Sequence, residues 1–386
     1  MARTVPWIIL VLTLLGGCND AGPAPEPEPL SFAWQEVALP VPPGPAGRLA
    51  PRDATACGER WYVVGAVIGP DDATRPAAWT SADDGQTWTS MRFHPRTFYG
   101  EQAVLYSAAC RGDEFATIGA KSGGAHGNPR VTQWYLRPDG VVDEVIAGFQ
   151  QYGGPTAGSV RRIVASPDGW LIAGNRASGG AVWLSRDATA FELVEGVPPL
   201  ARDAAATTAA ADAVRRPEGW VVVGGAQAVG RIDRDPAAFL SADGKTWSRV
   251  GLPGTNGYDD LQRVVVLDDD LVAVGLAGAS FGAWRRTGGS WQQAGRFGST
   301  GSSGTANVPG VAVAGKEVFV SASDGTAHSL WASADGGVTW QSVVLPGAAP
   351  AGSDRSATLA GSGERLILVV DDGLAGKLWS TKIAPG

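Results

Sequence analysis

The chain has 386 residues, of which 44% are hydrophobic, and its formal net charge is −7. This hydrophobic fraction is typical of a folded globular protein. The acidic balance, without runs of Lys or Arg, argues against nucleic acid or an anionic lipid surface as the main partner. The 54 glycines and 26 prolines, with few long stretches of helix formers, fit an all-β chain, in which one domain can exceed the usual size.

The N-terminus carries an export signal. Arg3 precedes the apolar run Val5–Leu15, which is too short to span a bilayer comfortably. The following Leu15-Gly16-Gly17-Cys18 resembles the lipobox of bacterial lipoproteins, which are cleaved before a cysteine that is then acylated. The resemblance implies a signal peptide over 1–17 and a membrane-anchored lipoprotein of the bacterial cell envelope, periplasmic or on the outer surface, with Cys18 lipidated. An ordinary secretory signal is the alternative. The Pro-rich segment 18–30 is interpreted as a semi-rigid tether.

Short β-rich runs, such as Gly58–Gly65 and Glu218–Gly224, recur along the rest of the chain. They align on seven positions that lie 47 to 55 residues apart: Trp61, Phe115, Trp170, Trp220, Leu271, Val318 and Leu366. A period near fifty with several strands per unit is typical of propeller blades. The sequence therefore predicts one seven-bladed β-propeller of four-stranded antiparallel blades over 31–386.

Each run is preceded by another apolar strand and followed by a third strand that is centred on an aromatic residue. These aromatic residues are Trp79, Trp134, Trp183, Phe239, Trp284, Trp331 and Trp379. A fourth strand follows in most units and opens with Trp88, Phe191, Trp247, Trp291 or Trp340, whereas blade 2 shows no clear equivalent. We interpret these aromatic positions as core, because each large buried apolar side chain contributes about 2–3 kcal/mol.

The seventh unit ends without a fourth strand. The segment Trp34–Pro40 ("WQEVALP") is similar to Trp340–Pro346 ("WQSVVLP"), which opens the fourth strand of the sixth unit. We therefore expect the N-terminal strand to complete the last blade, which would close the ring and remove an open sheet edge.

Two cysteines remain beside Cys18. Cys57 and Cys110 end the first strands of adjacent predicted blades, where equivalent positions can approach closely. Because an exported chain lives where disulfides persist, we expect a bridge between them; two separate buried thiols are the alternative.

A Ser-x-Asp-(x)-Gly-x-Thr-Trp motif lies between the third and fourth predicted strands of three blades. Its copies contain Ser81, Asp83, Gly85 and Trp88; Ser241, Asp243, Gly244 and Trp247; and Ser333, Asp335, Gly337 and Trp340. Three copies favour a folding role over a catalytic one. The aspartate can accept hydrogen bonds from its own loop, and the glycine supplies backbone angles that other residues resist.

These three segments resemble the Asp-box, or BNR repeat, of the sialidase-type propellers. The resemblance implies that the motif is structural and lies on the face away from the ligand site. In that superfamily the fold serves sialidases, other glycoside hydrolases, sorting receptors and photosystem assembly factors. The motif therefore predicts the fold but says little about the activity.

The opposite face carries long loops with arginines and carboxylates. The ligand-face candidates are Asp71, Arg75, Arg96, Arg130, Arg202, Arg231, Asp233, Arg234 and Arg355. The leading hypothesis is a non-catalytic binding or assembly module whose loops bind a protein or glycan partner. The alternative is a sialidase-type glycoside hydrolase, although the early Arg-Ile-Pro signature of sialidases is missing. No metal or cofactor motif is present, so we expect no cofactor, no nucleic-acid partner and a monomer.

Overall fold

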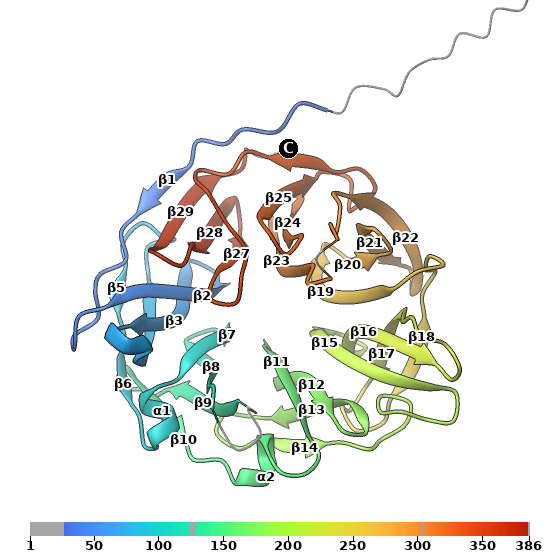
Figure 1. Ribbon diagram of the computed structural model, residues 1–386, viewed down its shortest axis with the longest axis horizontal. Helices are drawn as coiled ribbons and strands as arrows, with labels where there is room; N and C mark the ends of the chain where they lie inside the picture. Colours follow the sequence, from blue (N-terminus) through green and yellow to red (C-terminus); the bar gives the residue numbers. More distant parts are fainter. Residues whose placement is uncertain (1–26, 124–128, 303, 385–386) are drawn as a thin grey trace, which may run out of the picture.

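The computed structural model describes residues 27–123, 129–302 and 304–384, which form a ring of seven β-sheets (Figure 1). Each sheet is one blade of a β-propeller, so the predicted fold class is confirmed. The predicted signal peptide, Cys18 and most of the tether lie outside the described residues. Within the described ranges, no helix is long and apolar enough to cross a membrane.

The strands of each blade are arranged in order from the centre of the ring to its rim. The innermost strands are β2 (Arg48–Cys57), β7 (Val104–Arg111), β11 (Ala157–Ser166), β15 (Ala206–Arg216), β19 (Asp259–Leu267), β23 (Asn307–Ala314) and β27 (Ser356–Ser362). The second strands are β3 (Arg60–Ile68), β8 (Glu114–Lys121), β12 (Gly169–Arg176), β16 (Gly219–Ala228), β20 (Asp270–Ala277), β24 (Glu317–Ser323) and β28 (Arg365–Asp371).

The third strands carry the predicted aromatic residues, and the fourth strands form the rim. The third strands are β4 (Thr74–Ser81), β9 (Arg130–Leu136), β13 (Gly179–Ser185), β17 (Asp235–Ser241), β21 (Ser280–Thr287), β25 (His328–Ser333) and β29 (Gly376–Lys382). The rim strands are β5 (Thr89–Ser90), β10 (Val141–Val145), β14 (Glu192–Val194), β18 (Ser248–Gly251), β22 (Ser290–Phe297), β26 (Gln341–Val343) and β1 (Gln35–Val37). Within the described residues, three one-turn helices lie in the connections: η1 (Pro70–Asp72), α1 (Phe98–Glu101) and α2 (Phe149–Tyr152).

Blade 2 departs from the sequence-based expectation. It has a fourth strand, β10, which no aromatic residue opens and which the repeat therefore did not reveal. A short strand from the preceding connection, β6 (Arg92–His94), then pairs in parallel with β10 and gives this blade five strands.

The N-terminal strand closes the ring. In blade 7, β1 pairs antiparallel with β29, and Gln35, Glu36 and Val37 lie opposite Ser380, Trp379 and Leu378. Figure 1 shows this blue strand beside the red C-terminal strands. Leu30, just before it, forms a parallel bridge to Val343 of blade 6, so the same segment also contacts the neighbouring blade.

The hydrophobic core lies between the blades. One cluster joins Trp61 and Trp79 of blade 1 to Ile367 and Val369 of blade 7, and all four side chains are fully buried. Similar clusters fill the other seams. The indole of Trp79 also donates a hydrogen bond to the carbonyl of Pro40, so its polar atom is satisfied (2.7 Å).

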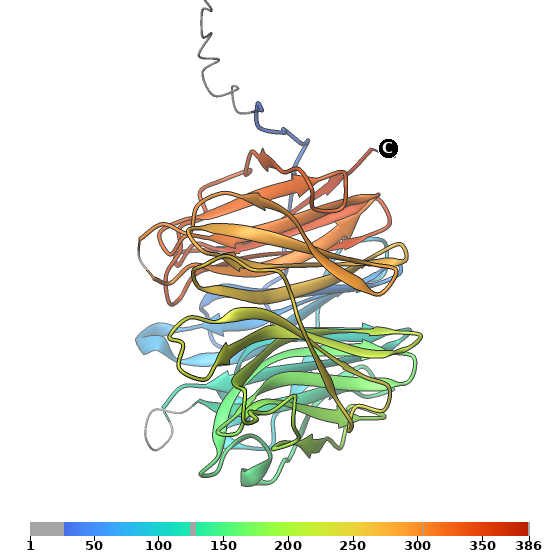
Figure 2. The same cartoon turned by 90° about the vertical axis from the view of Figure 1, so that its right-hand side faces the viewer.

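The two faces of the ring differ. The loop face carries the connections between second and third strands and between blades, and the turn face carries the tight hairpins and the Ser-x-Asp motifs. Figure 2 shows the ring edge-on as a thick disc, and its last strand, β29, ends on the turn face.

Each motif folds into a compact turn. In the first, Asp83 accepts hydrogen bonds from the backbone and hydroxyl of Thr87 (2.9 and 2.6 Å), and the Ser81 hydroxyl accepts from Gly85 N (2.9 Å). The indole of Trp88 then donates to the Gly85 carbonyl (3.1 Å). The hydrogen bonds that Asp83 itself accepts, first that from the Thr87 hydroxyl and then that from Thr87 N, hold its pKa well below the usual value. The aspartate is therefore an acceptor fixed by its own turn.

The other two copies repeat the arrangement. Asp243 accepts from the backbone N–H groups of Lys245 and Thr246 (2.8 and 2.7 Å), which lower its pKa to about 2. Asp335 accepts from the backbone and hydroxyl of Thr339 (2.9 and 2.6 Å). We name these three segments (81–88, 241–247 and 333–340) the aspartate turns.

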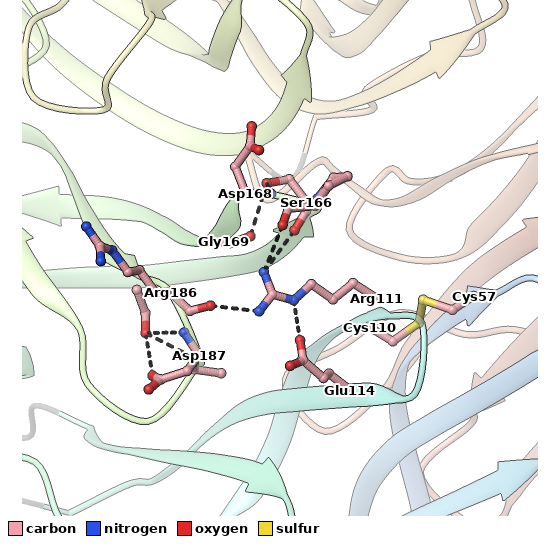
Figure 3. Close-up of polar contacts among 12 residues, drawn as sticks. Cys57, Cys110, Arg111, Glu114, Ser166, Asp168, Gly169, Arg186 and Asp187 are labelled. Carbon is pink, nitrogen blue, oxygen red and sulfur yellow. Dashed lines mark hydrogen bonds and ion pairs between the residues drawn. A yellow bond between two sulfur atoms is a disulfide. The ribbon is translucent and has the colours of Figure 1, made fainter.

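Cys57 and Cys110 form a disulfide that joins the innermost strands of blades 1 and 2, with their Cα atoms 6.0 Å apart (Figure 3). The next residue, Arg111, continues this link to blade 3. Its guanidinium donates to the carbonyls of Ser166 and Arg186 (3.2 and 2.7 Å) and lies over the ring of Trp170, 5.4 Å from the ring centroid. Figure 3 shows this side chain reaching across the seam. The turn face of the first three blades is thus cross-linked.

One buried histidine makes the stability depend on pH. His328 is 8% exposed, and neither ring nitrogen has a hydrogen-bond partner among the described residues. Burial lowers its pKa from 6.5 to about 4, against the opposing charge of Asp324. Between these values the unfolded state binds a proton that the folded state excludes, so stability falls as the pH drops below 6.5.

We therefore predict that wild-type protein loses about 2 kcal/mol of unfolding free energy between pH 7.5 and pH 5 through this one residue. A His328→Leu variant should lose correspondingly less over the same interval, because its side chain cannot bind a proton. Urea unfolding at the two pH values measures the difference. Equal losses in the two proteins would contradict the assignment.

Candidate binding groove on the loop face

The predicted arginines do lie on the loop face, but most are engaged locally and do not converge. Arg96 pairs with Asp143 (2.6 Å), and Arg234 pairs with Asp260 (3.3 Å). Arg231 pairs with its neighbours Asp233 and Asp235. These ion pairs brace individual loops in blades 2, 4 and 5.

The remaining candidates are spread around the ring. Arg75 donates to the carbonyls of Pro42 and Pro45 (both 3.1 Å), and Arg355 donates to that of Ala351 (3.2 Å). Arg202 is exposed, and so is Asp71, which lies in η1 with a left-handed backbone (φ 57°). Arg130 has a different setting, because its guanidinium lies against two aromatic rings.

Other carboxylates that could have formed a catalytic pair are also bound into the scaffold. Asp259 is fully buried and accepts hydrogen bonds from the Thr255 hydroxyl (2.8 Å) and Gly278 N (2.9 Å). Asp371 is likewise fully buried and pairs with both Arg48 and Arg52. Burial raises the pKa of Asp260, although the charge of Arg234 opposes this effect.

A large groove opens on the loop face at the seam between blades 2 and 3. Its volume is about 1170 Å³, and most of its surface is apolar. Residues of both blades line it, among them Tyr99, Tyr106, Arg130, Phe149, Tyr152 and Val160. This volume exceeds the range of about 300–1,000 Å³ that is usual for small-molecule sites.

The floor of the groove is held in place by buried hydrogen bonds. The Tyr106 hydroxyl of blade 2 donates to the carbonyl of Val160 in blade 3 (2.9 Å), and the Tyr152 hydroxyl donates to the side chain of Gln133 (2.7 Å). Burial raises the pKa of both tyrosines, so both remain protonated donors near neutral pH. The groove is therefore preformed.

Glu144 fixes one wall. It is 2% exposed, and its carboxylate accepts hydrogen bonds from Arg96 N (2.6 Å), Thr97 N (2.9 Å) and the Thr97 hydroxyl (2.6 Å). These bonds hold the start of α1, which carries Tyr99 into the groove. Gly100 of the same helix packs so closely that an added Cβ would lie 2.0 Å from a Glu144 oxygen.

Arg130 lies between two aromatic rings at the groove. Its guanidinium carbon is 5.7 Å from the ring centroid of Tyr99 and 4.8 Å from that of Phe149. Its Nε is buried without a hydrogen-bond partner among the described residues. Stacking on aromatic faces holds a guanidinium in one plane, ready for a planar anion.

Sequence reasoning found Arg130 but missed Tyr99, Glu144 and Phe149. A signal was present: the two longest spacings in the repeat, 54 and 55 residues, lead from Trp61 to Phe115 and from Phe115 to Trp170. The connections that contain α1 and α2 fall within these two intervals. Extra residues in connections between otherwise regular blades indicate where a loop face is elaborated.

Comparisons with solved structures place the chain among β-propellers. It is similar to a structure described as YCF48 bound to D1 peptide, with a TM-score of 0.53 and 15% identity over 91% of this chain and 97% of the other. It is similar to the β-propeller domain of the Trilobed protease from Pyrococcus furiosus, with a TM-score of 0.53 and 8% identity over 87% and 96% of the two chains.

A sialidase from Trypanosoma rangeli has a TM-score of 0.45 and 9% identity, over 92% of this chain and 59% of the sialidase. No family model matches the sequence, and no curated protein is similar to it. At these identities the likeness to the first two structures supports a β-propeller fold, and the number of blades comes from the sheets themselves. The function has to be argued from the groove.

The close approach of Gly100 to Glu144 gives a prediction. A Gly100→Ala variant should lose about 1–3 kcal/mol of unfolding free energy, because the new methyl group must displace a hydrogen-bonded, buried carboxylate. Gly251→Ala is the matched control, since its Cβ would meet no atom within 4 Å. Urea unfolding of the two variants and the wild type measures the effect. Equal stability of the two variants would show that α1 does not pack on Glu144.

Proposed function

We propose that the protein is a non-catalytic binding or assembly module that takes a segment of a protein partner in the groove between blades 2 and 3. The observation that carries the proposal is the groove itself: preformed, mostly apolar, edged by aromatic rings and open on the loop face. A rigid scaffold with ligand-contacting loops is a common arrangement for recognition.

The comparisons support a protein partner. The structure described as YCF48 carries a bound peptide and matches nearly the whole of this ring. A peptide is thus a ligand that a propeller of this overall shape can hold. The aspartate turns support a relationship to the Asp-box propellers, whose motif is structural.

The proposal includes an anchor. Lipidation of Cys18 after removal of 1–17 would attach the ring to a membrane of the bacterial cell envelope through the tether 18–30. Two or more acyl chains give lasting attachment, whereas one chain does not. The partner would then be another protein of that compartment.

Binding is preferred over sialidase-type hydrolysis because neither the arginines nor the carboxylates of the loop face converge. A sialidase uses a tyrosine nucleophile and, as the resemblance implies, a cluster of arginines that holds the substrate carboxylate, whereas Arg96, Arg231 and Arg234 pair with separate aspartates. Other retaining and inverting glycosidases need two carboxyl groups that face the scissile bond. Glu144, the carboxylate among the described groove-lining residues, accepts three hydrogen bonds from 96–97. Asp259 and Asp371 are buried in scaffold contacts. A glycan remains a less supported ligand of the same face.

Site-directed photo-crosslinking in the native cells tests the proposal. A benzophenone amino acid replaces either Phe149, which is 60% exposed at the groove, or Val338, which is 51% exposed on the turn face. We expect one protein adduct from position 149 and none from position 338. The partner segment, identified by mass spectrometry and synthesised, should then bind the purified wild-type protein.

Two results would contradict this function. One is equal crosslinking from the two positions, which would mean that the loop face is not the binding face. The other is turnover of a fluorogenic sialoside or glycoside by the purified protein, which would favour the hydrolase.

A further inference from the structure

Arg130 differs from three of the loop-face arginines in how its charge is balanced, and it differs from Arg75 and Arg355 in donating to no backbone carbonyl of the described residues. Arg96, Arg231 and Arg234 each pair with an aspartate of their own loop or blade seam. In the described ranges, no carboxylate lies within ion-pair distance of Arg130, whose guanidinium lies over the rings of Tyr99 and Phe149. Arg130 is half-buried, and a charge that is partly removed from water without a counter-ion is destabilising until an anion binds beside it.

The other charged side chains that line the groove are already satisfied. Both carboxylate oxygens of Glu144 accept hydrogen bonds from 96–97, so Glu144 does not pair with Arg130. Arg52, the second lining arginine, pairs with Asp371. Among the described groove-lining residues, Arg130 is therefore the cation that has no carboxylate partner.

Exposed apolar side chains form a rim near this cation. Ile146 and Phe149 line the groove and are 64% and 60% exposed, and Phe98, which is 66% exposed, packs edge-on against Tyr99. Side chains of this size are normally buried. The rings of Tyr99 and Phe149 flank the guanidinium. A ligand that fits must therefore offer apolar surface and one anionic group together.

We propose that this groove selects a peptide segment in which a carboxylate, paired with Arg130, lies next to apolar side chains that cover the rim. The inference rests on the proposed function and specifies the chemistry of its ligand. An acidic side chain and a chain's C-terminal carboxylate present the same planar anion, which a guanidinium binds through two parallel hydrogen bonds. A peptide is favoured over a saccharide because most of the lining is apolar.

Three pooled hexapeptide libraries test this chemistry, each with a mixture of Leu, Phe, Val, Ser and Gly at the variable positions. The first has a central Glu and an amidated end, the second a central Gln and an amidated end, and the third a central Gln and a free C-terminal carboxylate. Retention on immobilised wild-type protein is measured by mass spectrometry, with 3′-sialyllactose as a further probe. The variants are Arg130→Gln and, as a matched loss of one exposed loop-face arginine, Arg202→Gln.

We expect at least one carboxylate library to be retained about tenfold more strongly than the neutral library, because only a carboxylate can form a charge-assisted hydrogen-bonded pair with Arg130. Arg130→Gln should abolish the preference, and Arg202→Gln should keep it. The first and third libraries distinguish a side-chain carboxylate from a terminal one.

Equal retention of the neutral library by wild-type protein would overturn the inference while leaving peptide binding, and so the proposed function, in place. This comparison holds even if Arg130→Gln fails to fold. An unchanged preference in folded Arg130→Gln, retention of no library, or retention of sialyllactose alone would also overturn it. Crosslinking from position 149 reports on the proposed function independently of these outcomes.

Discussion

The antiparallel pairing of β1 with β29 joins residues from opposite ends of the chain and converts a row of blades into a closed ring. Without it, blade 7 would end in an open edge, and its seam with blade 1 would depend on side-chain contacts, such as the pairing of Asp371 with Arg48 and Arg52. Because each hydrophobic cluster is shared by neighbouring blades, every seam depends on the ring being complete. Because the two strands are far apart in sequence, this closure is a long-range contact that does not form within any single blade.

The groove follows from that closure. Its two walls belong to different blades, and the position of one relative to the other is fixed by links across the seam: the Tyr106 hydroxyl bond to Val160 on the floor and the contacts of Arg111 on the turn face. The disulfide of Cys57 and Cys110 extends the same bracing to blade 1. A binding site at a seam is rigid only if the ring around it cannot open.

The blade count, the closing strand and the cysteine pairing were predictable from sequence because each follows from a period. Trp79, Trp134 and Trp183 recur at matching positions, and Trp34 continues the rim-strand pattern. The groove was not predictable in this way. Tyr99 and Phe149 lie in connections that break the period. The role of Glu144 depends on the backbone conformation of 96–97, which no sequence pattern predicts. Pairing among loop arginines likewise depends on distances that a sequence does not show.

Amide hydrogen exchange of the intact protein tests ring closure most directly. Closure by β1 predicts that Gln35–Val37 is protected by about a hundredfold or more relative to an unstructured peptide, since it pairs with β29. Leu378–Ser380 is protected as well, because it pairs with both β1 and β28. Exchange of Gln35–Val37 at the rate of an unstructured peptide would mean that the ring is not closed by its N-terminus, and the account would be wrong.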